Sequence, residues 1–333
     1  MIDVREQLSH DGAAVVMLCS RLGLSDPIEP GGSPLTLKEW NALEHKIEDA
    51  GLGSPVSLLG MSAIDLSQRL AVPEADAERF AQLLDRGGAI ALELEQLTAS
   101  GIWCLTRVDS GYPPRIKNSL KHQAPPVLFG AGDSSILERP AIGIVGSRNI
   151  DDEGANFARR LAEKCARASA AVVSGGARGT DRIAMQGALD AGGYSVGIVA
   201  DSLAKTIRQS DVRNVIADQR LVLLTPYRPD NAFSIGGAMG RNKIIYGSSD
   251  YSVIVSSEFE KGGTWAGAVE ALTAGWCPLF VRATEASGRG NQELINKGAH
   301  ALSEPNLADV DDMIGWMKEN SASTPRQEML AFS

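Results

Sequence analysis

The order of apolar and polar positions divides the chain into a helical first part and a second part in which strands and helices alternate. Apolar side chains recur at helical spacing in residues 35–52, where Trp40 and Leu43 share a face and Glu and Lys fill positions between them. Residues 77–101 hold two further helical pieces, separated by a pair of glycines. We therefore predict a small all-α module over residues 1–100, and nothing in its sequence indicates catalysis.

From residue 101 the pattern changes. Residues 101–132 alternate extended runs with proline pairs, which is typical of a connector that carries one or two strands. Short unbroken apolar runs then follow, with helical segments between several of them: 141–148, 170–176, 194–200, 221–227, 251–257 and 277–283. Unbroken apolar strands favour a parallel sheet that is covered on both faces. The sequence thus predicts a doubly wound α/β domain over residues 101–305 and a polar tail over 306–333.

Composition narrows the class of partner. Apolar residues make up 44% and charged residues 22% of the 333 residues, which is typical of a globular chain. The net charge of −9 argues against a general electrostatic grip on a polyanion, so any nucleic-acid site must be a local patch. The four cysteines are scattered, and the chain has neither a signal peptide pattern nor an apolar run of transmembrane length. We expect reduced thiols in a cytoplasmic protein, with no metal, cofactor or membrane.

Glycine-bearing turns follow three of the predicted strands, and they are the strongest sign of a binding site. In an open parallel sheet, ligands bind beyond the carboxyl ends of the strands. Glycines allow backbone N–H groups to converge on an anion, and a following helix adds its positive N-terminus. Arg148 and Arg178 add forked donors that suit a phosphate. The turns could instead only reverse the chain, but three on one edge favour phosphate binding: Gly146-Ser147-Arg148, Ser174-Gly175-Gly176-Ala177-Arg178-Gly179 and Gly262-Gly263-Thr264.

The usual catalytic patterns are missing from the sequence. The turn VGSRN lacks the dinucleotide pattern GxGxxG, and there is no Walker A lysine, no GxSxG elbow and no Cys/His pair. The four histidines lie outside the candidate turns. We therefore expect a binding protein and no catalytic residues.

A further stretch, residues 233–250, places cations at the start of an apolar helix. It reads FSIGGAMGRNKIIYGSSD, and Phe233 and the nearby Tyr227 could stack on nucleobases. Aromatic side chains beside arginines are the minimum needed for binding a single strand. The alternative is that Phe233 fills the core.

Seven segments, in order along the chain, resemble the DNA-processing protein A (DprA/Smf) family. The resemblance spans residues 100–303, and its segments are DSGYPPRIK (109–117), APPVLFGAGD (124–133), AIGIVGSRN (141–149), SGGARGTDRIAMQGAL (174–189), GRNKII (240–245), the GGT turn (262–264) and GNQELINKGAHAL (290–302). It implies a Rossmann-like core and a non-enzymatic protein that binds single-stranded DNA, helps to load the RecA recombinase in DNA processing or natural transformation, and forms a homodimer. The DNA-contacting positions that it implies are Ser147, Arg148, Gly175 to Gly179, Phe233, Arg241, Asn242 and Lys243, with Gly262, Gly263 and Thr264 completing the pocket.

The chain departs from the family pattern near this pocket. Met185 stands where the family usually has His, Trp265 follows the GGT turn, and residues 201–220 are polar and lack the expected Tyr-Pro. No winged-helix segment follows the core, so a divergent paralogue from a mobile element or a defence locus is one interpretation. Two other functions stay open: a sensor of a nucleotide-derived signal, and a phosphoribohydrolase, for which Glu270 is offset from the usual motif.

Overall fold

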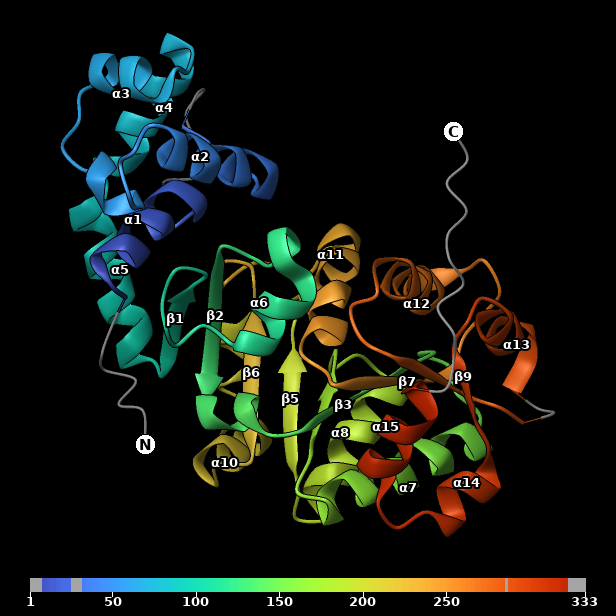
Figure 1. Ribbon diagram of the computed structural model, residues 1–333. Coiled ribbons are helices and arrows are strands. Elements are labelled where there is room, and N and C mark those ends of the chain that lie inside the picture. Colours follow the sequence, from blue (N-terminus) through green and yellow to red (C-terminus); the bar gives the residue numbers. More distant parts are fainter. Residues whose placement is uncertain (1–7, 25–31, 285–286, 323–333) are drawn as a thin grey trace, which may run out of the picture. The chain divides into compact units, whose positions relative to one another are not determined.

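The computed structural model describes residues 8–24, 32–284 and 287–322 of the chain (Figure 1). The chain divides into two compact units. Unit 1 comprises Met1–Glu138 and Ile198–Ile244, and unit 2 comprises Arg139–Gly197 and Ile245–Ser333.

The described residues 8–24 and 32–99 of unit 1 are largely helical, as the sequence predicts for the helical module. Thr36 and Ser62 begin two of its helices with reciprocal capping boxes, in which the hydroxyl accepts from the third backbone N–H and an acid returns the bond. Trp40, Leu18 and Leu58 are fully buried and centre its core. The helices are α1 (His10–Cys19), α2 (Leu37–Asp49), η1 (Pro55–Leu58), α3 (Ala63–Leu70), α4 (Glu74–Leu84) and α5 (Gly87–Ala99).

Unit 1 also contains three antiparallel strands. Strand β2 (Val127–Gly132) pairs with β1 (Ile102–Thr106) on one side and with β6 (Leu221–Thr225) on the other. Gly130 lies opposite Trp103, and a Cβ there would collide with the indole ring, so the position requires glycine. Short helices connect these strands and follow them: α6 (Pro114–Leu120), η2 (Lys121–Gln123), η3 (Ser134–Glu138), α9 (Leu203–Thr206), α10 (Ser210–Ala217) and the start of α11 (Ile235–Gly247).

Two charged side chains after β1 attach the helical module to these strands. Arg107 is buried, forms an ion pair with Glu44 of α2 and donates to the Ala124 carbonyl at 3.2 Å. Asp109 accepts from the Ser9 hydroxyl at 2.6 Å and from the Thr106 hydroxyl at 2.5 Å. The connector between β1 and β2 therefore contacts the module through charge-assisted hydrogen bonds.

Unit 2 contains a parallel sheet with the strand order β5-β4-β3-β7-β8-β9. From β3 the chain winds outward through β4 to β5, and from β7 it winds the other way through β8 to β9. The order therefore reverses between β3 and β7, and this switch point is where open α/β sheets bind ligands. The strands are β3 (Ala141–Gly146), β4 (Ala171–Ser174), β5 (Tyr194–Ile198), β7 (Tyr251–Ser256), β8 (Leu279–Arg282) and β9 (His300–Leu302).

Helices cover both faces of this sheet, as the unbroken apolar strands predict. One apolar cluster joins Phe157 and Leu161 of α7 (Asp152–Arg167) to Val253, Phe280 and neighbouring strand residues. Helices α8 (Thr180–Asp190), α14 (Glu304–Asp309) and α15 (Met313–Ala322) also contribute to it. Helices α12 (Gly262–Ala274) and α13 (Gly288–Asn296) connect β7 to β8 and β8 to β9. Because parallel crossovers are right-handed and these two run in the opposite direction along the sheet, both helices lie on the opposite face.

The segment after residue 305 contributes to this core. Met313 and Met317 of α15 are fully buried, so the stretch interpreted as a polar tail contributes side chains to the core of unit 2. The remaining residues of that stretch, 323–333, lie outside the described residues. None of the described helices is long and apolar enough to cross a membrane.

Candidate functional site

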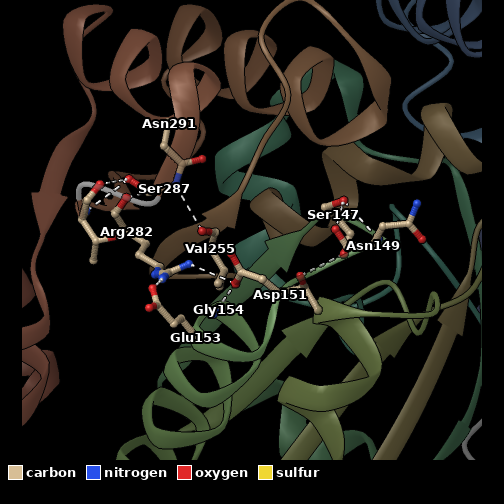
Figure 2. Close-up of polar contacts among 11 residues, drawn as sticks. Ser147, Asn149, Asp151, Glu153, Gly154, Val255, Arg282, Ser287 and Asn291 are labelled. Atoms are coloured by element: carbon tan, nitrogen blue, oxygen red, sulfur yellow. Dashed lines mark hydrogen bonds and ion pairs between the residues drawn. The ribbon is translucent and has the colours of Figure 1, made fainter.

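The turn after β3 is held in shape by its own serine. The Ser147 hydroxyl accepts from the Asn149 N–H at 3.1 Å and donates to the Asn149 carbonyl at 3.0 Å (Figure 2). Asp151 then caps the 16-residue helix α7 by accepting from the Gly154 N–H at 2.7 Å. The turn thus leads directly into a helix N-terminus, which carries a partial positive charge.

The turn after β4 lies directly on the turn after β3. Gly179 has φ +84°, and a Cβ there would lie 2.5 Å from the Arg148 carbonyl oxygen. The Thr180 hydroxyl donates to the Ser147 carbonyl at 3.0 Å, and the Thr180 N–H donates to the same carbonyl at 3.2 Å. Because glycine alone tolerates both this φ and this approach, Gly179 sets the spacing between the two turns.

The start of α12 closes on the same point. The Thr264 hydroxyl donates to the Gly146 carbonyl at 3.1 Å, and Gly262 adopts φ +75°. The structure therefore brings together the three turns that the sequence singled out, at the switch point between β3 and β7. We call this set, residues 146–149, 174–179 and 262–264, the three-turn site.

Side chains of the three-turn site divide into exposed and buried groups. Arg148, Arg178 and Gly176 are exposed, and the Arg178 guanidinium donates to the Asn149 amide oxygen at 3.0 Å. Ser174 is fully buried and donates to the Ile144 carbonyl at 2.6 Å, so its side chain contacts the neighbouring strand. The two arginines are therefore the cationic groups of the site that solvent reaches.

The other predicted contacts belong to unit 1. The side chain of Phe233 is 52% exposed, which excludes the alternative that it fills the core. Arg241 is 6% exposed, and Asn242 and Lys243 are half-buried on α11. The nearby Tyr227 donates its hydroxyl to the Gly237 carbonyl at 2.8 Å, and burial raises the pKa of that phenol.

Sequence reasoning missed two buried polar residues near the three-turn site. Arg282, at the end of β8, is 1% exposed and forms ion pairs with Asp151 at 3.7 Å and Glu153 at 3.3 Å (Figure 2). Asn291 of α13 is fully buried and donates to the carbonyls of Val255 at 3.1 Å and Arg282 at 3.0 Å. Asn291 could have been noticed, because it lies within the family-like segment 290–302. Arg282 could not, because nothing in the sequence around an arginine at the end of an apolar run indicates that it is buried.

The described residues offer little reactive chemistry. Burial raises the pKa of Cys165 and of Cys277 to about 12, so both thiols stay protonated near neutral pH. Within the described ranges, no three His, Cys, Asp or Glu side chains gather at a spacing that could hold a metal ion. The arrangement is suited to binding an anion through backbone N–H groups and arginines.

Comparisons with known proteins point to one family. The family model of the DNA recombination-mediator protein A matches residues 103–313. The DNA processing protein DprA of Bacillus subtilis is 27% identical over 299 residues, which cover 88% of this chain and 93% of that protein. Protein Smf of Escherichia coli is 27% identical over 231 residues, which cover 66% of this chain and 60% of that protein.

Two solved structures resemble the fold. The DprA structure from Streptococcus pneumoniae superposes with a TM-score of 0.61 at 20% identity, covering 83% of this chain and 98% of that one. The structure of DNA processing protein A from Helicobacter pylori, described for its single-stranded DNA binding mode, gives a TM-score of 0.53 at 26% identity, covering 66% of this chain and 97% of that one. The first of these similarities supports the Rossmann-like fold expected from the sequence.

Proposed function

Because the chain belongs to the DNA recombination-mediator protein A family, we propose that it binds single-stranded DNA at the three-turn site. The observation that carries the proposal is the direct contact among the three turns, through Gly179, Thr180 and Thr264. We infer that their convergence at the switch point of the sheet places backbone N–H groups of the turns around one anion. The Helicobacter pylori relative, described for its single-stranded DNA binding mode, supports the same choice of ligand.

Phosphate groups would be held by the turns, and bases by an aromatic side chain. Arg148 and Arg178 supply exposed forked donors for two successive phosphates. Phe233, which is half exposed, supplies a face on which a base can stack, and Lys243 adds a cation on the same segment. Contacts to phosphate and to the π-face carry little sequence information, so binding would be largely independent of base sequence.

The wider role follows the family. We propose that the protein acts without catalysis as a recombination mediator that helps to load RecA onto single strands, and that it works as a homodimer. The four free thiols fit a reducing, cytoplasmic compartment. Gly146, Ser174, Gly175 and Gly263 would shape the turns, and Asn242 and the buried Arg241 would support the segment that carries Phe233.

The test is a titration of the protein with labelled single-stranded and duplex DNA of about 30 nucleotides, at about 50 mM and about 200 mM salt. We expect preference for the single strand and a steep fall of affinity with salt, because each neutralised phosphate releases counterions. Arg148→Ala and Lys243→Ala should each weaken binding and reduce the salt slope by about 0.7. Arg167→Ala is the matched control, because its side chain is 72% exposed at the far end of α7.

A sensor of a nucleotide-derived signal is the alternative, favoured by the net charge of −9. An acidic protein accommodates one small anion more readily than a long polyanion. If mononucleotides bind the protein with shallow salt dependence while strands do not bind at about 50 mM salt, the sensor replaces the mediator. Normal strand binding by both Arg148→Ala and Lys243→Ala would mean that the strand binds elsewhere.

A further inference from the structure

Three consecutive acidic residues follow the turn after β3. Their negative charges are unfavourable for a protein that binds phosphate at this turn. Asp151, Asp152 and Glu153 are all exposed and begin two residues after Asn149. Acids are favourable at a helix N-terminus, because they complement the partial positive charge there. The same carboxylates repel the phosphates of a strand that lies on the neighbouring turn.

Arg282 reaches two of these acids from another strand. Its guanidinium lies 3.7 Å from the Asp151 carboxylate and 3.3 Å from the Glu153 carboxylate, whereas Asp152 forms no ion pair with any of the described residues. Gly154 makes room for it, since a Cβ there would lie 3.0 Å from the Arg282 Nη1 atom. Figure 2 shows the guanidinium between the start of α7 and the end of β8, with Ser147 and Asn149 on the other side of Asp151.

Arg282 is far more buried than the two acids with which it pairs. Its side chain is 2% exposed, whereas the side chains of Asp151 and Glu153 are 58% and 71% exposed. Its Nε atom has no hydrogen-bond partner within the described part of the chain, and its guanidinium carbon lies 5.8 Å from the centre of the Phe157 ring. Stability alone gives little reason for a charge at such a position, because replacing a buried ion pair with apolar side chains of similar volume is often neutral or stabilising.

We propose that Arg282 is a positioning residue for the three-turn site: it offsets two of the three acids at the start of α7 and holds that start against β8. The inference rests on the proposed function, because the offset matters only when the ligand is a polyanion. Arg282 does not itself contact the strand, since it is 1% exposed. It therefore raises strand affinity by removing a repulsion and by fixing the backbone that follows Asn149.

The experiment compares strand binding by the wild type, Arg282→Met and the triple variant Arg282→Met, Asp151→Asn, Glu153→Gln. Asn at residue 151 keeps the helix cap, because Asn and Asp cap equally well. We expect Arg282→Met to weaken binding about five-fold at ~50 mM salt, with the difference shrinking at ~500 mM salt as the exposed carboxylates are screened. The triple variant should bind more tightly than Arg282→Met, because it lacks the two carboxylates that the lost arginine offset.

Arg160→Met is the control for charge. Arg160 lies on the same helix and pairs with Glu304 at 2.9 Å, so its loss also leaves one acid unpaired, but further along the helix from the turn. Its strand affinity should equal that of the wild type. Thermal unfolding of every variant identifies any loss that comes from partial unfolding.

Two results would overturn the inference. Unchanged binding by Arg282→Met would show that the acids do not oppose the strand, and weakened binding that the triple variant fails to restore would show that the loss comes from packing. Amide exchange over residues 147–154 gives a readout that needs no DNA, and we expect it to be faster in Arg282→Met. If the wild type binds no strand, the proposed function fails, and unchanged exchange in this variant would separately exclude the positioning role.

Discussion

At the scale of single residues, the contact between the first two turns of the three-turn site requires glycine at residue 179, because a side chain there would collide with the neighbouring turn. Gly179 combines φ +84° with a carbonyl oxygen 2.5 Å from the place of a Cβ. Gly192 has φ +78°, yet nothing lies within 4 Å of the place of its Cβ. Gly192 is therefore a control for a positive φ without a collision.

Gly179→Ala should destabilise the protein more than Gly192→Ala does. A positive φ costs alanine about 1 kcal/mol at Gly192. Gly179 has φ +84° and ψ −130°, a backbone conformation that costs alanine about 1–3 kcal/mol, and the collision with the Arg148 carbonyl adds to this cost or displaces the turn after β3. Denaturant unfolding measures the difference, and strand titration should show weaker binding for Gly179→Ala alone. Equal losses of stability at the two positions would mean that the two turns yield without cost.

At the scale of elements, the start of α2 gives a pH-dependent contribution to stability. The Arg79 guanidinium hydrogen-bonds to Glu39, and the backbone N–H and hydroxyl of Thr36 donate to the same carboxylate. These bonds lower the pKa of Glu39 from 4.5 to about 2, against the opposing effect of burial. A carboxyl with a lowered pKa stabilises the folded state above its unfolded pKa, and the contribution is lost as pH falls from 4.5 to about 2.

Glu39→Gln should therefore lower the free energy of unfolding at pH 7 and make no difference near pH 2. The side chain of Glu39 is 42% exposed, so solvent screening limits the expected loss to about 0.5–1 kcal/mol. Denaturant unfolding across this pH range measures it. Glu48→Gln, on the exposed far end of the same helix, is the control and should cost nothing. A loss that persists unchanged to pH 2 would contradict the assignment to the charge of Glu39.

Elements were the part of the structure that the sequence predicted best. Continuous apolar runs correctly predicted β3, β4, β5, β6, β7 and β8. The two helical pieces of residues 77–101 were also predicted, but the break between them falls at residues 85–86, and the glycine pair begins α5. Pairing was harder to predict, because β2 and β6 run antiparallel within a mainly parallel fold. The helices α14 and α15 were hidden by the polar residues of their segment, since only Leu307, Met313 and Met317 face the core fully.

The turns of the candidate site could be predicted from the sequence, but the buried side chains beneath them could not. Glycines and arginines at strand ends are visible in the sequence, whereas the burial of Arg282 and Arg241 depends on which elements pack around them. Burial of a charged side chain follows from tertiary contacts between residues far apart in the chain. Arg282 meets Asp151 across 131 positions of the sequence, which no local pattern records.

At the scale of the whole molecule, the net charge and the family membership set expectations for assembly. A charge of −9 on each chain opposes association, so a homodimer must gain its stability from apolar or paired contacts. Light scattering at about 150 mM salt should give twice the chain mass if the proposed dimer forms. A monomer mass across the accessible concentration range would exclude the dimer while leaving strand binding by a single chain possible.

The hydrogen bond from Thr264 to Gly146 joins positions 118 residues apart. A chain emerging from the ribosome therefore passes through a long interval in which its first two turns have emerged and the third has not. During that interval the nascent protein has exposed arginines but an incomplete cradle. Competence to hold a strand would then arise late in synthesis, only after α12 has folded onto the sheet.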